Sequence, residues 1–508
     1  MQESVRASGA GGGVRTPSSA QEVAVLRGHL ERVGYTADGV LARIGEDGQE
    51  GLLRNVTVPA LHALGEARDE LAAAIRLFCL GQDVPADQVS FLEPVADVFL
   101  APGAAPGHVK AAVDLRPYGS PDDGASGWVV SDVMPSLDFV TAPTHPSYVL
   151  GVSPASSTLA QMVMRAPVGS ALDLGTGCGV QSLHLARHAG HVVATDLNPR
   201  AVTLASWSAA LSGAEIEFAC GDLFAPVAGR RFDLIVSNPP FVLSPPSSEE
   251  DTLTYRETNF RGDGLLATIL ADAPRHLAPS GSIQLLTNWA IVDGQPWEER
   301  LAGFAQGTGL DFFAIERERL DVYSYIEMWL ADAGLAGTAG WRPAYERWLR
   351  YFADLGIVGV GMGWICATAA GRATPHVRIE SWPHAVQQPV GEVFARHRAA
   401  VDAALVPDDV LLASRPSLVD VREETMGQPG AADPEYLVLR QSRGLLRAMQ
   451  VDTAFGAVLG ALDGELSVGQ VIAAVADLLD EDPADLRTRL LPPLRTALEE
   501  QYLRPEEG

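Results

Sequence analysis

Residues 171–179 read Ala-Leu-Asp-Leu-Gly-Thr-Gly-Cys-Gly, and this stretch decides the fold of the central part of the chain. Its mostly apolar start predicts a buried strand, and the glycines at 175, 177 and 179 predict a turn into a helix. Because glycine lacks a Cβ, it can adopt positive φ and let a bound molecule approach the backbone closely. The stretch therefore predicts a nucleoside-binding turn at the end of a strand.

The glycine spacing distinguishes between two kinds of nucleoside site. A dinucleotide-binding turn follows Gly-x-Gly-x-x-Gly, which would place its third glycine at position 180. That position is Val180, and Gly179 comes one place too early. An NAD-dependent oxidoreductase is therefore disfavoured.

Two further acids follow at the ends of the next predicted strands. Asp196 ends His-Val-Val-Ala-Thr-Asp, 23 positions after Asp173, and Asp222 follows a third strand in Cys-Gly-Asp-Leu. An acid about 20 residues after the glycine turn can accept hydrogen bonds from ribose hydroxyls in nucleoside-binding α/β sheets. We therefore expect Asp196 to bind a ribose.

A fourth predicted strand, 232–236, leads through Ser237 into Asn238-Pro239-Pro240-Phe241. The side-chain oxygen of Asn238 and the carbonyl of Pro239 can each accept one N–H of a planar amide or amino group. Such a nitrogen is a poor nucleophile because its lone pair is delocalised, and two acceptors would partly localise that lone pair. Proline makes the loop rigid, so the acceptors are preorganised, and Phe241 can stack on the planar group.

Alternating strands and helices from about Pro146 to Pro383 predict an α/β fold with a mostly parallel sheet. A helix over 341–355 reads as an insertion near the sheet edge, and the closely spaced last strands suggest an antiparallel edge strand. The flanking sequence predicts a helical N-terminal part with a β extension and a mainly helical C-terminal part. The predicted divisions are a disordered tail at 1–20, an N-terminal substrate-recognition domain at 21–145, the α/β domain at 146–385 and a winged-helix-like module at 391–508.

Composition restricts the possible partners. The net charge of −27 opposes binding to polyanions, although a local arginine patch could still bind nucleic acid. No apolar run reaches the about 18–20 residues that cross a bilayer, so no membrane partner is expected. The four cysteines are widely spaced, which fits a reducing cytoplasm and neither a disulfide framework nor a metal site.

The motifs together resemble class I S-adenosylmethionine (AdoMet)-dependent N-methyltransferases, in particular the methyltransferase small domain family, over about residues 145–290. The resemblance implies a Rossmann-like core with a seven-stranded sheet, and AdoMet as the cofactor. It also implies that Asp222 accepts from the adenine amino group, that Leu197 and Leu223 sandwich the ring, and that Thr158 lies near the methionine end. The implied cofactor-binding residues are Asp173, Gly175, Thr176, Gly177, Gly179, Asp196, Leu197, Asp222, Leu223, Asn238 and Thr158; the implied catalytic residues are Asn238, Pro239, Pro240 and Phe241.

The resemblance leaves the macromolecular substrate open between a protein glutamine and an RNA or DNA base. Phe241 stands where release-factor glutamine methyltransferases more often carry tyrosine, whereas several ribosomal-RNA methyltransferases carry phenylalanine. Residues 242–261 predict an acidic cover over the target, which favours a protein glutamine over a phosphate-bearing substrate. A non-catalytic AdoMet-binding scaffold is a further alternative, which the intact Asn-Pro-Pro-Phe disfavours, and the C-terminal module is a candidate site for a protein partner.

Overall fold

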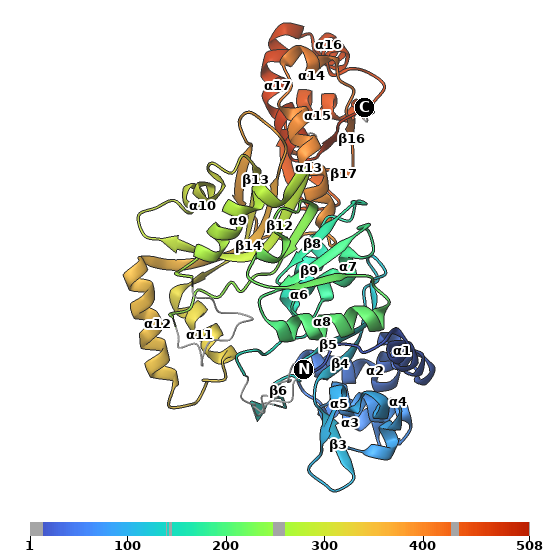
Figure 1. The fold of residues 1–508 in the computed structure, drawn as a ribbon. Helices are drawn as coiled ribbons and strands as arrows, with labels where there is room; N and C mark the ends of the chain where they lie inside the picture. Colours follow the sequence, from blue (N-terminus) through green and yellow to red (C-terminus); the bar gives the residue numbers. More distant parts are fainter. Residues whose placement is uncertain (1–13, 139, 142–144, 247–259, 428–435, 507–508) are drawn as a thin grey trace. The chain divides into compact units, whose positions relative to one another are not determined.

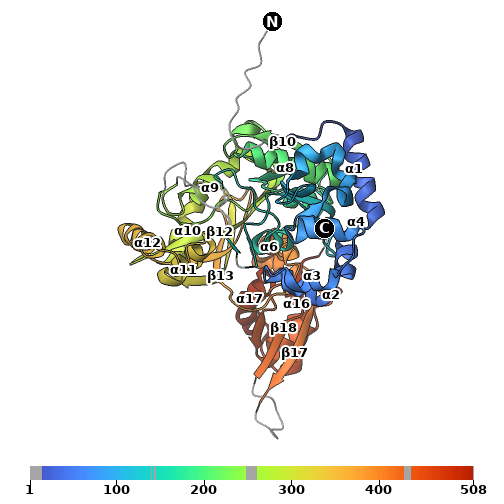
Figure 2. The same ribbon diagram turned by 90° about the horizontal axis from the view of Figure 1, so that it is seen from below.

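The computed structural model describes residues 14–138, 140–141, 145–246, 260–427 and 436–506 (Figures 1 and 2). The chain forms two compact units. The first comprises Met1–Ala160, Pro167–Gly309 and Glu318–Ala369, and the second comprises Gln161–Ala166, Leu310–Arg317 and Ala370–Gly508. In the described residues, no helix is long and apolar enough to cross a bilayer. The predicted domain boundaries stay predictions.

The central sheet has eight strands in the order β10-β9-β8-β11-β12-β14-β13-β15, which confirms the predicted α/β class. β10, β9, β8, β11 and β12 pair in parallel, whereas β14 runs antiparallel to β12. β8 and most of β11 are buried apolar runs, as expected for parallel strands covered on both faces. The strands are β8 (Ala171–Leu174), β9 (Val192–Asp196), β10 (Glu217–Cys220), β11 (Phe232–Ser237), β12 (Leu277–Val292), β13 (Asp311–Asp321), β14 (Ile357–Thr368) and β15 (Val377–Ser381).

Two details of the predicted sheet were wrong. The sheet has eight strands rather than seven, because β15 adds a further strand beside β13. The expected antiparallel edge strand is also absent among the described residues, since the edge strands β10 and β15 both pair in parallel. The antiparallel strand is β14, which lies inside the sheet order.

Local sequence signals account for the start and the end of α8 (Pro199–Ser212). Asn198 caps α8 by accepting from the Arg200 N–H at 3.0 Å, Pro199 takes the first helical position, and Gly213 ends the helix at φ 70°. A helix over 341–355 is present, as predicted. The helices in and around the α/β core are α6 (Pro154–Met162), α7 (Val180–Leu185), α8 (Pro199–Ser212), α9 (Gly264–His276), α10 (Trp297–Ala305), α11 (Val322–Asp332) and α12 (Trp341–Leu355).

The N-terminal helices share one hydrophobic core with α8, and α1 lies beside α8 in Figures 1 and 2. The Phe99 ring meets the Trp207 ring edge-on at 5.3 Å, and the Val130 N–H donates to Ser208 Oγ at 2.8 Å. These contacts make the N-terminal residues part of the first unit. The elements are α1 (Ala20–Val33), α2 (Ala37–Leu53), α3 (Val58–Leu64), α4 (Glu70–Ala74), α5 (Ala96–Phe99), β1 (Val84–Pro85), β2 (Leu100–Pro102), β3 (His108–Ala111), β4 (Asp114–Gly119), β5 (Ser126–Ser131), β6 (Ser136–Leu137) and β7 (Val140–Thr141).

In the second unit, helices pack on a three-stranded antiparallel sheet, β17-β18-β19. Phe455, Ile472 and Leu494 are buried in the core of this unit. The described residues after 435 form the strands β18 and β19, three helices and the short strand β20. The winged-helix-like module stays a prediction. The elements are α13 (Gly391–Ala404), α14 (Asp408–Ala413), β16 (Ser417–Leu418), β17 (Val421–Met426), β18 (Tyr436–Gln441), β19 (Ala448–Val451), α15 (Thr453–Gly460), α16 (Val468–Leu479), α17 (Pro483–Glu499) and β20 (Leu503–Arg504).

Candidate functional site

A cavity of about 640 Å³ lies at the carboxyl ends of β8, β9, β10 and β11 in the first unit. Ligands of open α/β sheets bind outside these strand ends, where the loops leave room. The segment Tyr148–Gly151, the start of α6 and the side of α9 complete its wall. Residues predicted from the sequence that line it are Asp173, Gly175, Thr176, Gly177, Asp196, Leu197, Asp222, Leu223, Asn238, Pro239 and Pro240.

Asp173 lies at the bottom of the glycine turn and is 1% exposed. Its Oδ2 accepts hydrogen bonds from the hydroxyls of Thr176 (2.7 Å) and Ser182 (2.6 Å). Burial, opposed by the two hydroxyl donors and assisted by the charge of nearby Asp196, raises the pKa of this carboxyl from 3.8 to about 6. Gly175 and Gly177 have φ of 79° and 57°, and a Cβ on either would meet open space. The turn thus leaves the cavity unobstructed beside an acid.

Asp196 ends β9 and organises the chain around it. Its Oδ2 accepts from the Gly177 N–H at 2.9 Å and its Oδ1 accepts from the Asn198 N–H at 2.8 Å. Burial raises the pKa of its carboxyl. Each carboxylate oxygen has two lone pairs, so Asp196 can still accept from a pair of vicinal hydroxyls in the cavity.

Apolar side chains flank the part of the cavity near Asp222. Leu197 is 57% exposed although it is apolar, and Leu223 has φ 43°, a conformation that non-glycine residues seldom adopt. Ile269 of α9 also lines the cavity. An exposed leucine beside an acid provides a place for a flat ring whose edge donates hydrogen bonds.

Asn238 leaves β11 at the cavity wall with its acceptor oxygen unused. Its Oδ1 is buried and accepts no hydrogen bond from the residues that the structure describes. The strand end before it is fixed, since the Ser237 hydroxyl donates to the Leu174 carbonyl at 2.6 Å. A buried acceptor without a donor costs stability, so an orphaned oxygen at a cavity indicates an N–H or O–H supplied by a ligand.

Three predicted site residues lie away from the cavity. Phe241 packs edge-on against Trp329 of α11 with ring centroids 6.1 Å apart. It therefore contacts α11 and does not line the cavity. Gly179 lies behind the turn, where a Cβ would come within 3.1 Å of the Ala205 side chain. Thr158 lies on α6, but Ser153 and Ser156 at the start of that region line the cavity in its place.

The sequence reasoning missed the segment Tyr148–Gly151 and the residues that hold it. Buried Asp132 accepts from the Val149 N–H at 2.8 Å and from Arg200 Nε at 3.0 Å, and Asn198 Nδ2 donates to the Ser147 carbonyl at 2.9 Å. These contacts join β5, α8 and the cavity wall across about 17 to 68 positions of sequence. Such pairings leave no local pattern that could have predicted them.

Residues 247–259 of the predicted cover lie outside the described residues. This range contains Glu249, Glu250 and Asp251, so the acidic cover stays a prediction.

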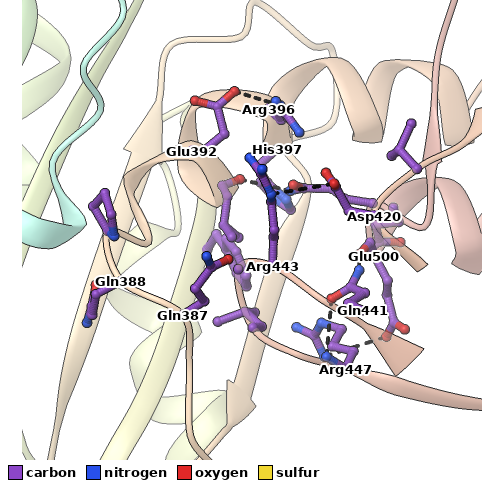
Figure 3. Close-up of a pocket in the computed structure, with 18 of the residues that line it drawn as sticks. Gln387, Gln388, Glu392, Arg396, His397, Asp420, Gln441, Arg443, Arg447 and Glu500 are labelled. Carbon is purple, nitrogen blue, oxygen red and sulfur yellow. Dashed lines mark hydrogen bonds and ion pairs between the residues drawn. The ribbon is translucent and has the colours of Figure 1, made fainter. Parts of the chain in front are cut away.

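A second cavity of about 410 Å³ lies in the second unit and is lined by charged side chains (Figure 3). Several of these are paired with one another, such as Arg378 with Glu499 at 2.9 Å and Arg396 with Glu392 at 2.6 Å. His397 is buried there, and burial lowers its pKa to about 3. None of the residues predicted for the site is among the described residues that line this cavity.

Comparisons with known proteins agree with the geometry of the first cavity. Residues 149–295 match the methyltransferase small domain family, and residues 32–105 match a domain of unknown function (DUF7059). The release factor glutamine methyltransferase of Geobacter sulfurreducens is 32% identical over 34% of this chain and 61% of its own length; that of Deinococcus radiodurans is 38% identical over 29% and 55%. The ribosomal RNA small subunit methyltransferase C of Alcanivorax borkumensis is 34% identical over 24% and 32%.

The chain spans less than two thirds of the length of each of these relatives. The family match covers the strands and loops that form the first cavity. The segment from 149 to 295 is therefore similar to the methyltransferase small domain family.

Proposed function

We propose that this protein is an AdoMet-dependent N-methyltransferase that methylates the side-chain amide of a glutamine in a protein substrate. The observation that carries the proposal is the buried, unpartnered Oδ1 of Asn238 at the wall of the first cavity. A protein that only bound AdoMet would have no need of an orphaned acceptor beside the cofactor.

The residues around the cavity fit AdoMet in size and chemistry. Pockets of about 300–1,000 Å³ hold molecules of this size, and this one measures about 640 Å³. Asp196 would accept from the ribose hydroxyls, Asp222 would accept from the adenine amino group, and Leu197 and Leu223 would enclose the ring. Two acids whose pKa values are raised would be stabilised in their ionised forms by a cationic ligand.

The chain's own part in the reaction is to bind, orient and polarise the target nitrogen. When bound, AdoMet supplies the methyl group on its sulfonium. Asn238 Oδ1 accepts one N–H of the amide and the Pro239 carbonyl accepts the other, which localises the nitrogen lone pair towards the cavity. Both acceptors belong to a stiff Asn-Pro-Pro loop, so they need no reorganisation as positive charge develops on the nitrogen. The proton leaves the nitrogen after transfer, which requires no catalytic base.

The electrostatics of the cavity favour a protein substrate. Among the described residues that line it, none is lysine, arginine or histidine, whereas three are aspartate. A phosphate-bearing nucleotide would meet no cation there, and nucleic-acid sites usually provide several. The two relatives named release factor glutamine methyltransferases support the same substrate class.

The test is methyl transfer from tritiated AdoMet by the purified full-length protein, with a release factor and with ribosomal RNA as separate substrates. We expect labelled product with the release factor that is lost on protease treatment and survives ribonuclease. Label that is lost on ribonuclease treatment would show an RNA base as the target. Absence of AdoMet binding by calorimetry would refute the methyltransferase proposal altogether.

A further inference from the structure

The helical hairpin α11–α12 contacts the loop that follows Asn238. The hairpin connects β13 to β14, since α11 starts directly after β13 and a single residue separates α12 from β14. Its buried aromatic residues form one hydrophobic cluster with Val242 and Leu243. The loop that carries the orphaned acceptor is therefore packed against an element that does not line the cavity.

The contacts from α11 fix this loop at two alternate positions. Tyr325 is fully buried, and its hydroxyl oxygen accepts from the Leu243 N–H at 3.1 Å and from Asn288 Nδ2 at 3.3 Å. One turn further along α11, Trp329 meets Phe241 edge-on. Residues four apart share one face of a helix, so a single face of α11 holds both loop residues.

A contact from α12 fixes the chain where it enters α9. The Tyr351 hydroxyl oxygen accepts from the Gly262 N–H at 2.7 Å. Gly262 has φ 59°, and Asp263 after it is held by Arg300 at 2.6 Å and by the Ala290 N–H at 2.9 Å. α9 carries side chains that line the cavity, so the hairpin fixes a second part of the cavity wall.

We propose that the α11–α12 hairpin positions the target-nitrogen acceptors, and that Tyr325 is the positioning residue that fixes the loop after Asn238. This inference rests on the proposed methyl transfer. The direction of Asn238 Oδ1 and of the Pro239 carbonyl depends on how the loop leaves β11. Pro239 and Pro240 are stiff, so an anchor at Leu243 constrains the acceptors four to five residues earlier. The Tyr325 hydroxyl thereby affects kcat although it does not contact the substrate.

The experiment compares Tyr325→Phe with Tyr345→Phe in the full-length protein. The first variant keeps the ring and removes the hydroxyl that accepts from the Leu243 N–H and from Asn288 Nδ2. The second removes a hydroxyl of the same hairpin that donates to Glu327 at 3.0 Å, and is the matched control. We measure hydrogen exchange in peptides spanning residues 237–244, AdoMet affinity by calorimetry, Tm, and kcat for methyl transfer.

For Tyr325→Phe we expect faster exchange in the 237–244 peptides, unchanged AdoMet affinity, and a kcat lowered about 10- to 100-fold, as a small misplacement of reacting groups would cause. Tyr345→Phe should match the wild type in all of these. Unchanged exchange and kcat in Tyr325→Phe would overturn the proposal, as would a loss of AdoMet affinity equal to the loss of kcat. If Tyr325→Phe does not fold, Trp329→Phe is judged by the same readouts. If the wild type transfers no methyl group, the proposed function fails, and the exchange measurement still decides whether the hairpin holds the loop.

Discussion

Replacing Asn238 by alanine should separate turnover from stability. Among the described residues, none donates a hydrogen bond to the buried Oδ1 of Asn238, so the loss of about 0.5–1.5 kcal/mol that follows deletion of a made bond does not apply. The free energy of unfolding should therefore fall by less than about 1 kcal/mol. In the reaction the same oxygen would be a preorganised acceptor for a nitrogen that becomes positive. Removing one such group costs on the order of 10²–10³ in kcat, or about 2.7–4 kcal/mol of transition-state stabilisation.

The assay is steady-state methyl transfer to the release factor at saturating AdoMet, with calorimetric AdoMet binding and urea unfolding on the same samples. Asn238→Asp is the conservative variant, because it keeps acceptor oxygens at the same position and should retain more turnover than Asn238→Ala. A kcat for Asn238→Ala within about threefold of the wild type would refute the role of the acceptor. A large loss of stability together with a proportionate loss of kcat would show that Asn238 acts on folding instead.

Three further predictions concern the cofactor cavity. The pKa of Asp173 is about 6, and a cationic cofactor favours its ionised carboxylate. AdoMet affinity should therefore rise with pH from 5 to 7 and then level off. In Asp173→Asn, the Kd measured by calorimetry should not depend on pH in this way. Without cofactor, the free energy of unfolding should change with pH in the opposite direction to AdoMet affinity. The raised pKa of Asp173 stabilises the folded protein most below pH 3.8, and this stabilisation should be lost as the pH rises through about 6. Gly177→Ala should weaken AdoMet binding more than it lowers Tm, because its Cβ would project into the cavity. Gly179→Ala should mainly lower Tm, because its Cβ would press on Ala205. Equal effects of the two variants on AdoMet binding would contradict this prediction. Arg200→Gln should release the segment Tyr148–Gly151, raise the AdoMet Kd about tenfold and leave kcat at saturating AdoMet unchanged. Calorimetry measures the Kd and steady-state kinetics measure kcat. An unchanged Kd would show that the segment stays in place without Arg200.

The sequence by itself determined the parts of the site that local backbone chemistry dictates. Gly175 and Gly177 have the positive φ that the turn needs, Asp196 ends its strand beside that turn, and Asn238 follows β11. In each case the residue type at or just after the end of a strand suits the backbone that follows, so a few adjacent positions are enough to predict the site residue. These residues meet because the carboxyl ends of parallel strands lie at one edge of a sheet.

Only the tertiary structure decided which side chains face the cavity and which face the protein. Phe241 follows the acceptor loop in sequence, but it turns to Trp329, which lies 88 positions later in the chain. Gly179 belongs to the glycine turn, but it meets Ala205 of α8. The direction of a side chain at a loop or turn depends on partners from distant segments, whose free energy of packing outweighs local preference. Spacing along the chain therefore predicted most of the proposed site residues that line the cavity. Long-range packing determined which other residues hold the cavity wall in place.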